Sequence, residues 1–164
     1  MTVYTTIDSP IGELRLAGEP SAAGVVLTAL SMGGAKAVAV QDDWIEDATV
    51  FGAVAAQLHD YFAGDRTEFD VEFATAGSDF QRRVWQALER IPYGATVTYG
   101  EIAASIGAPR AAVRAVGTAI GANPLLILRP CHRVIGADGS LTGYAGGVER
   151  KQRLLELEQA RRAA

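Results

Sequence analysis

A chain of 164 residues, 49% of them hydrophobic, is long enough to bury the core of one ordinary domain or of two small ones. Its single cysteine excludes an internal disulfide, and with only two histidines a zinc cage of thiolates and imidazoles is hard to build. No apolar run approaches the roughly 18 to 20 residues that would span a bilayer. We therefore expect a cytoplasmic protein that uses no metal and no cofactor.

The net charge of −4 hides an uneven distribution along the chain. Residues 1–77 hold 3 Lys and Arg against 12 Asp and Glu, whereas residues 78–164 hold 12 against 7. The second part is therefore the candidate for binding a polyanion such as nucleic acid. Uneven surface charge that only serves solubility explains the same counts equally well.

The first strands are expected close to the start of the chain. Polar and apolar residues alternate over 3–7 and 14–17, around the turn formers of 8–12, which predicts a β-hairpin. A third strand is expected at 25–31, and the alternating run 68–73 is expected to return to the sheet.

A single helix is expected within this sheet region. The stretch 33–48 is rich in Ala, Gly and Asp without a steady period and is interpreted as a loop. Helical spacing of Val54 and Leu58 predicts a helix over 50–63, with Gly64 in the left-handed conformation that ends many helices.

The sequence becomes basic and helical after Gly77, and we expect the domain boundary between residues 77 and 78. Ser78 and Gln81 form a capping box, which opens a helix that stops before Pro92. One face of this helix carries its large apolar residues, Phe80, Val84, Trp85 and Leu88.

A second capping box, Thr98 with Glu101, predicts a short helix that ends at Gly107. Pro109 then stands where a third helix would begin, continuing toward Gly121. Two short helices joined by a tight turn have the outline of a helix-turn-helix, in which the second helix meets DNA. Short helix pairs are common, so this outline alone is weak evidence for DNA binding.

The remaining chain predicts a buried strand or loop, a glycine-rich loop and a closing helix. Residues 124–135 are apolar apart from a polar cluster at 129–133. Five glycines lie in 136–147, and an amphipathic helix is expected over 148–160.

The polar cluster contains the only thiol, Cys131, beside His132 and Arg133. A neighbouring base or cation can ionise a thiol or take its proton, so the cluster suits a nucleophile. A small buried cysteine beside an unrelated histidine is the alternative. In a strand, moreover, neighbours point to opposite faces, so contact between Cys131 and His132 needs a turn or a bridging water.

The cluster Pro130 to Val134, followed by Ile135 and Gly136, resembles the active-site signature of the O6-alkylguanine-DNA alkyltransferases. The resemblance covers about residues 78–160 well and residues 1–77 only in general layout. It is carried upstream by Ile91 to Gly94, Thr98 to Glu101, Arg114 to Gly117, Asn123 and Pro124, and downstream by Gly143, Tyr144, Leu154, Leu155 and Glu158.

The resemblance implies an α+β chain with two parts. The first is a small N-terminal domain of sheet and helix with a ribonuclease H-like layout, over residues 1–77. The second, over 78–164, is a helical domain that holds a helix-turn-helix and the active-site strand or loop.

The implied reaction is one irreversible transfer of an alkyl group from O6 of guanine in DNA, and also from O4-alkylthymine, to Cys131. His132 would accept the thiol proton through a water, and Glu158 would orient the imidazole. Asn123 would join the DNA-binding helix to the active-site strand. Tyr99 would donate to N3 of the leaving base.

The implied partner is double-stranded DNA that carries O6-alkylguanine, approached from the minor groove. Arg114 would fill the place of the extruded nucleotide. Thr98, Gly117 and Arg133 belong to the implied DNA contacts, although Arg133, like Arg110, could equally serve a structural carboxylate. The protein is expected to be a monomer in solution, with cooperative binding along DNA left open.

The guanine pocket implied by the resemblance is lined by Val134, Tyr144 and Ala145, together with the carbonyl of Cys131. Ala145 stands where some members of the family have serine, which a backbone donor tolerates.

Two further departures from the family bear on the site. Four residues separate Pro109 from Arg114, where three are expected, which would lengthen the loop or rotate the recognition helix. Arg129 replaces a residue that is usually apolar, so it must reach solvent or an acid. Two rival functions are a cysteine hydrolase and a non-catalytic module that binds alkylated DNA.

Overall fold

The computed structural model describes residues 1–34 and 37–163, with the side chains of 161–163 outside that description. The chain divides into two compact units, Met1–Thr75 and Ala76–Ala164. This division lies close to the boundary expected between residues 77 and 78. Each unit is described by itself.

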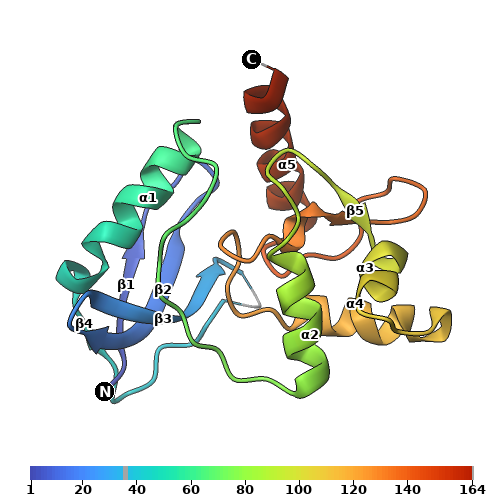
Figure 1. Cartoon of the computed structure of the whole chain (residues 1–164). Coiled ribbons are helices and arrows are strands. Elements are labelled where there is room, and N and C mark those ends of the chain that lie inside the picture. The colour runs from blue at the N-terminus through green and yellow to red at the C-terminus, as the bar shows by residue number, and fades with distance from the viewer. Residues whose placement is uncertain (35–36, 164) are drawn as a thin grey trace. The chain divides into compact units, whose positions relative to one another are not determined.

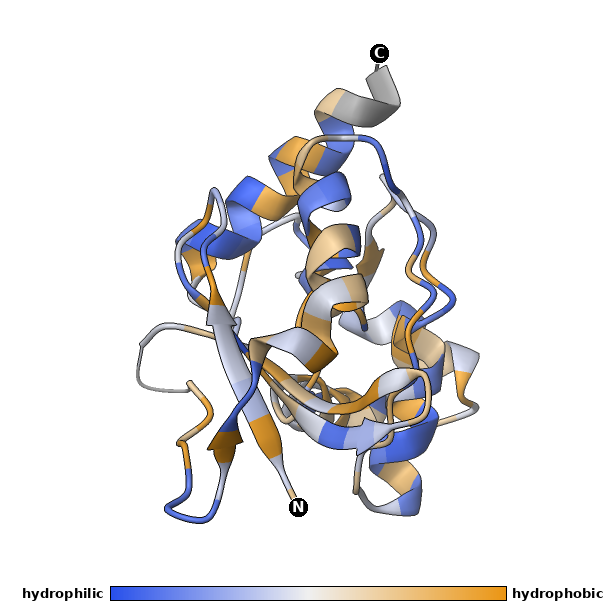
Figure 2. Ribbon diagram, turned by 90° about the vertical axis from the view of Figure 1, so that its left-hand side faces the viewer, coloured by the Kyte–Doolittle hydropathy of each residue, from blue (hydrophilic) through white to orange (hydrophobic). Residues whose placement is uncertain are grey.

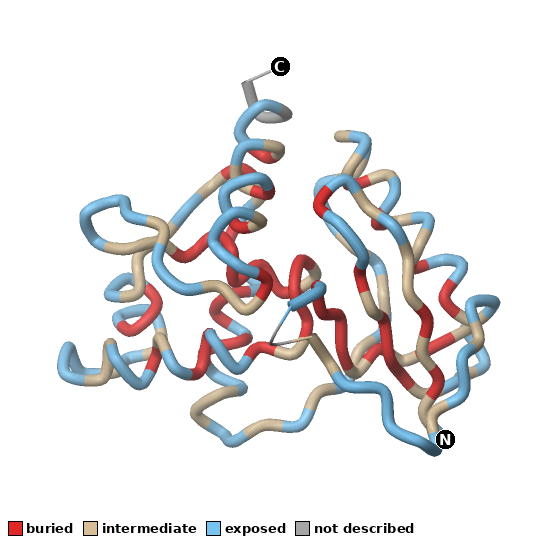
Figure 3. The backbone as a smooth tube through the Cα atoms, turned by 180° about the vertical axis from the view of Figure 1, so that it is seen from behind, coloured by how far each residue is buried: buried red, intermediate tan, exposed pale blue. Residues whose placement is uncertain are grey.

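The N-terminal unit is built on a four-stranded sheet in the order β3-β2-β1-β4 (Figure 1). Its strands are β1 (Val3–Ile7), β2 (Leu14–Ser21), β3 (Gly24–Met32) and β4 (Ile45–Glu46). β1 and β2 form the expected antiparallel hairpin, which pairs Val3 with Gly18 and Ile7 with Leu14. The predicted third strand is β3, which pairs antiparallel with β2, whereas β4 runs parallel to β1. Buried residues lie along β1, β2 and β3, whereas β4 is exposed (Figure 3).

The helix of this unit lies beside the sheet, on the side of β1 (Figure 1). A 3-10 turn, η1 (Ala48–Phe51), leads into α1 (Gly52–Phe62). The side chain of Asp47 caps the turn by accepting from Thr49 N. Gly64 follows the helix with a φ of 82°, so the expected left-handed end is confirmed.

Two predictions for this unit were incomplete or wrong. The stretch 33–48, of which 35–36 lie outside the described residues, contains the two-residue strand β4, which was too short to be recognised. Residues 68–73 were expected to return to the sheet as a strand, and only the end of this run does so. Phe73 bridges Leu27 of β3, where the Leu27 N–H donates to the Glu72 carbonyl and the Ala74 N–H to the Leu27 carbonyl, both at 2.9 Å. The side chain of Gln57 binds both backbone groups of Asp70, which ties the earlier part of the segment to α1.

The C-terminal unit is mainly helical. Its elements are α2 (Asp79–Leu88), β5 (Val97–Thr98), α3 (Tyr99–Ser105), η2 (Arg110–Ala112), α4 (Val113–Gly121), η3 (Cys131–Arg133), β6 (Val134–Ile135) and α5 (Val148–Ala163). Along α5 bands of hydrophilic and of hydrophobic residues alternate (Figure 2). Both predicted capping boxes are confirmed, because Ser78 and Thr98 each accept from the third backbone N–H of their helix and the Gln81 and Glu101 side chains accept in return.

The helix pair α3 and α4 stands where the helix-turn-helix was predicted. Gly107 ends α3 with a φ of 70°, a conformation that glycine adopts at little cost. The indole of Trp85 donates to the Ala119 carbonyl at 2.9 Å, which joins α2 to α4 in the core. Parallel pairing of β5 with β6 brings the start of α3 beside the chain that follows Cys131.

Candidate active site

Cys131 lies in a 3-10 turn, not in a strand. Residues Cys131 to Arg133 form η3, and β6 begins only at Val134. The Cys131 N–H donates to the Arg129 carbonyl at 2.7 Å, and the Arg133 N–H to the Pro130 carbonyl at 3.0 Å. All three residues of the turn are buried. The local structure is therefore a turn, so Cys131 and His132 are not forced to opposite faces as neighbours in a strand would be.

The chain enters this turn through a strained residue. Ile127 has a φ of 68° and is 2% exposed, the one non-glycine residue with positive φ among those described. A β-branched side chain rarely adopts this conformation, and such strain concentrates at functional sites.

Glu158 of α5 binds both neighbours of the thiol. Its Oε2 lies 2.8 Å from Nε2 of His132, and Arg133 donates to Oε1 at 2.8 Å and to Oε2 at 3.0 Å. Burial favours a raised pKa for Glu158, but the hydrogen bonds from His132 and Arg133 outweigh it and lower that pKa to about 2. The carboxylate is therefore ionised at neutral pH.

The His132 imidazole is held in one tautomer by this carboxylate. An ionised Glu158 can only accept, so Nε2 carries the proton and Nδ1 presents its lone pair. Nδ1 is shielded from solvent and makes no hydrogen bond with the described residues. Burial lowers the pKa of His132, which the bond to Glu158 partly opposes. The ring is thus a neutral base with its free nitrogen inside the protein.

The thiol of Cys131 is protonated at rest. Burial raises its pKa to about 11, and Asn123, Lys151 and Arg129 lower it only in part. At pH 7 about one molecule in 10⁴ is a thiolate. Proton removal must therefore accompany the reaction, and a base within reach of the thiol is needed.

Asn123 follows α4 directly and ties its end to the turn of Cys131. Its amide donates to the carbonyls of Leu125 at 3.1 Å and Arg129 at 3.0 Å, and its oxygen accepts from the Leu125 N–H at 3.1 Å. The residue is 5% exposed. These bonds match the hinge that the resemblance implied.

Arg133 reaches a carboxylate and not the surface. Besides Glu158 it donates to the Ile91 carbonyl at 2.7 Å, and its guanidinium lies 5.6 Å from the centre of the Tyr93 ring. Of the two partners considered for Arg133, the structure thus shows the structural carboxylate. A buried and bonded guanidinium cannot also contact a DNA phosphate, so that expectation is corrected.

The residues expected to meet DNA lie around α3 and α4. Arg114 is exposed in the first turn of α4, preceded by the 3-10 turn η2, which takes up the residues between Pro109 and the helix. Gly117 faces Tyr99, since a Cβ there would lie 3.8 Å from the tyrosine ring. The hydroxyl of Thr98 accepts from the Glu101 N–H and so caps α3.

Tyr99 contacts the glycine-rich loop in this structure. Its hydroxyl donates to the Thr142 carbonyl at 3.2 Å. The same carbonyl accepts from Nζ of Lys151 at 3.0 Å, and Nζ lies 5.9 Å from the centre of the Tyr99 ring. To donate to a base, the Tyr99 hydroxyl must leave this carbonyl, which keeps its bond to Lys151.

Lys151 was missed by sequence reasoning. It is completely buried and also donates to the Gly143 carbonyl at 3.4 Å. The signal was present in the helical spacing, because Lys151, Leu154 and Glu158 occupy one face of α5. A charged residue on an inward face is seldom buried without a partner.

Of the residues implied for the guanine pocket, Val134 follows the turn of Cys131, and Tyr144 and Ala145 lie in the glycine-rich loop. Val134 is buried, whereas Tyr144 and Ala145 are partly exposed. The Tyr144 hydroxyl is shielded from solvent, and burial, with Cys131 and Glu158 nearby, raises the pKa of this phenol well above its usual value.

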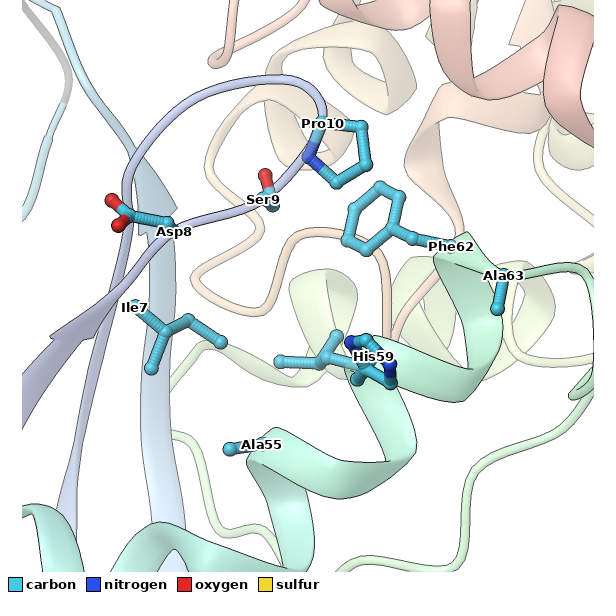
Figure 4. A pocket seen from close by; sticks show the side chains of 9 residues that line it. Ile7, Asp8, Ser9, Pro10, Ala55, His59, Phe62 and Ala63 are labelled. Carbon is cyan, nitrogen blue, oxygen red and sulfur yellow. The ribbon is translucent and has the colours of Figure 1, made fainter.

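A separate pocket of about 470 Å³ lies within the N-terminal unit, between the β1–β2 turn and α1 (Figure 4). Its lining is mostly apolar and includes Pro10 and Phe62, with His59 and Asp8 as its titratable groups. It contains none of the residues predicted for the site. Among the described residues no acidic, histidine or cysteine side chains are grouped to hold a metal, and no helix is long and apolar enough to cross a membrane.

A buried thiol and an imidazole held by a carboxylate lie in the same unit as the helix pair α3 and α4, an arrangement that suits the class of DNA-binding proteins with a reactive cysteine. The sequence matches "6-O-methylguanine DNA methyltransferase, ribonuclease-like domain" over residues 2–75 and "6-O-methylguanine DNA methyltransferase, DNA binding domain" over residues 79–160. The chain belongs to the 6-O-methylguanine DNA methyltransferase family.

Relatives match along the whole chain. The methylated-DNA–protein-cysteine methyltransferase of Mycobacterium tuberculosis is 56% identical over 164 residues, which is 100% of this chain and 96% of the relative. That of Methanosarcina acetivorans is 50% identical over 94% of this chain and 97% of its own length. The crystal structure of Mycobacterium tuberculosis OGT in complex with DNA superposes with a TM-score of 0.88 at 56% identity, covering 97% of this chain and 94% of that one.

Proposed function

We propose that this protein repairs DNA by moving the alkyl group of an O6-alkylated guanine onto Cys131 in a single irreversible event. The chain is a DNA-repair methyltransferase, and its family and full-length relatives support this activity. The observation that carries the residue assignment is the bonded pair of Glu158 and His132 next to the only cysteine of the chain.

The transfer is a displacement at the alkyl carbon. The bond from Sγ of Cys131 to this carbon forms while the bond from the carbon to O6 breaks. The thiol proton passes through a water to Nδ1 of His132, and the positive imidazole is stabilised by Glu158. The electron pair of the broken bond remains on the guanine, where the Tyr99 hydroxyl donates to N3 and disperses the charge.

The product is a thioether, which water does not hydrolyse, and the chain has no second cysteine to restore the thiol. Each molecule therefore acts once. A cysteine hydrolase would pass through a thioester and turn over many times, and a non-catalytic binding module would have no use for a base directed to a thiol.

Access to O6 requires that the nucleotide leave the base stack. Arg114, exposed at the start of α4, would occupy the vacated position in the duplex, approached from the minor groove. Gly117 and Thr98 would let the backbone approach the DNA. Val134, Tyr144 and Ala145 would line the pocket for the extruded base, and the same pocket would accept O4-alkylthymine.

The proposed partner is double-stranded DNA, bound by one molecule at a time or by several along a strand. A cytoplasmic location fits a reaction that consumes a free thiol, because the cytosol keeps thiols reduced.

Intact mass spectrometry after incubation with a duplex containing one O6-methylguanine tests the proposal. We expect a gain of one methyl group, about 14 Da, on the peptide that contains Cys131, saturating at one per protein molecule. Cys131→Ser is the matched control: it should bind the duplex and gain nothing. Binding without any gain in the unaltered protein would leave a lesion-binding module, and repeated turnover would indicate a hydrolase.

A further inference from the structure

A buried arginine lies behind the active-site turn. Arg129 is 4% exposed, and its guanidinium lies 4.8 Å from the centre of the Trp85 ring. Nε lies 3.4 Å from Oε2 of Glu89 at the end of α2, and NH1 donates to Oδ1 of Asn123 at 3.3 Å. Arg129 was expected to reach either solvent or an acid, because it stands in an apolar stretch; the acid that it reaches is Glu89.

The ion pair of Arg129 is unequal. The side chain of Arg129 is 5% exposed and that of Glu89 is 37% exposed. Water screens the carboxylate more strongly than the guanidinium, so the pair keeps a net positive field on its buried side. That side faces Asn123.

We propose that Arg129 is a positioning residue for Cys131, because its carbonyl and its guanidinium together hold the Asn123 side chain and the Cys131 backbone, and because it supplies a buried positive charge, two residues from the thiol, that favours the thiolate formed during transfer. The inference rests on the proposed role of Cys131 as the alkyl acceptor.

The connection runs through both backbone and side chains. The Arg129 carbonyl accepts from the Cys131 N–H at 2.7 Å and from the Asn123 amide at 3.0 Å. Burial raises the pKa of the Cys131 thiol, and both Asn123 and the Arg129 charge lower it. The guanidinium on Oδ1 of Asn123 polarises this amide and strengthens the bonds by which its N–H groups hold the Leu125 and Arg129 carbonyls.

Other charged and titratable groups also face the thiol. Lys151 from α5 is a second cation whose charge lowers the pKa of Cys131, and Tyr144 from the glycine-rich loop is a neutral phenol. His132 shares the turn and is neutral at rest. Arg129, which precedes the turn η3, and Lys151 of α5 are therefore two separate cations near the thiol. The effect of each on the pKa of Cys131 can be measured by substituting one at a time.

The two partners of the ion pair give opposite predictions. In Arg129→Leu the buried charge is lost, while Glu89 stays in contact with water and Oδ1 of Asn123 keeps the Leu125 N–H. The pKa of Cys131 should rise. In Glu89→Gln the guanidinium loses its compensating charge, so the pKa of Cys131 should fall. Because the carboxylate that Arg129→Leu leaves behind is in contact with water, no buried unpaired charge remains and the loss of stability should be small.

The titration is followed by ¹³C NMR of the Cβ of Cys131 in full-length protein labelled on cysteine, which gives one signal because the chain has one cysteine. Transfer from free O6-benzylguanine is timed at pH 7.5 in the same variants. In Arg129→Leu we expect the midpoint to move up by about 0.5 to 1 pH unit and the rate to fall by about 3- to 10-fold, with the melting temperature within a few degrees. Arg129→Lys should recover part of both losses.

In Glu89→Gln the midpoint should move down. The proposal is overturned if both variants leave the midpoint of the Cys131 titration unchanged, or if both move it in the same direction. This holds even if the transfer rates of the variants fall, provided that their melting temperatures fall as well. That result would make Arg129 a structural residue only. If the NMR shifts appear but neither the unaltered protein nor any variant gains a methyl group from duplex O6-methylguanine, the proposed function fails while the electrostatic role of Arg129 stands.

Discussion

Nε2 of His132 lies 2.8 Å from Oε2 of Glu158, and both side chains are almost completely excluded from solvent. This pair fixes the imidazole so that Nδ1 is the nitrogen available to a proton. A protonated His132 would be costly to bury without the carboxylate, because an unpaired charge in the interior is strongly unfavourable. The carboxylate therefore matters most at the moment of proton transfer.

Glu158→Gln should slow the transfer to Cys131 by about 10²-fold, the typical contribution of acid–base catalysis by a positioned group. Gln can still bind the ring but cannot balance its charge. The rate with free O6-benzylguanine, measured by mass spectrometry, gives the result. Gln152→Glu, at an exposed position of the same helix, is a control for altered charge. A rate in Glu158→Gln equal to that of the unaltered protein would remove Glu158 from the relay.

Glu158 should also make the protein sensitive to acid. Its pKa falls from 4.5 to about 2 on folding, so the ionised carboxylate stabilises the folded form above pH 4.5. This contribution, about 3 kcal/mol, is lost as the pH drops from 4.5 toward 2. Urea unfolding at pH 7, 4 and 3 measures it. Glu158→Gln should be less stable at pH 7 and should lose less stability on acidification. Parallel pH curves for the two proteins would contradict the assignment.

The local part of the fold could be predicted from sequence, and the contacts between distant segments could not. Ser78 and Thr98 cap their helices through residues three positions away, so the signal lies within one turn. The partners of Arg133 and Arg129 depend on where α5 and α2 pack, which no local pattern encodes. Sequence resemblance pointed to Cys131, His132 and Glu158 together, whereas the tautomer of the imidazole follows only from the geometry.

Arg114→Ala should separate repair of duplex DNA from the chemistry of the thiol. An exposed side chain that replaces an extruded nucleotide offsets a few kcal/mol of unstacking, so we expect about 10²-fold slower methyl transfer from duplex O6-methylguanine. Reaction with free O6-benzylguanine should change less than about twofold, since no base has to be extruded. Arg110→Ala, in η2 before the same helix, serves as the matched control. Equal losses with both substrates would reject the role of Arg114.

Lys151→Met should weaken the active site in two ways. The loss of Nζ leaves the Thr142 and Gly143 carbonyls without their ammonium donor, which loosens the loop beside Tyr99. It also removes a cation that lowers the pKa of Cys131, so this pKa should rise above about 11. We expect about tenfold slower transfer from free O6-benzylguanine at pH 7.5. The rate constant of the bound complex should fall, because a smaller fraction of Cys131 is thiolate.

Hydrogen exchange across the glycine-rich loop distinguishes the two effects of Lys151. Faster exchange at residues 142–144 in Lys151→Met, together with an upward shift of the Cys131 titration, is the expected outcome. Arg153→Met, at an exposed position of α5, should change neither quantity. If exchange rises while the titration stays in place, Lys151 only anchors the loop; if neither changes, the ammonium has no part in the site and the slower transfer must have another origin.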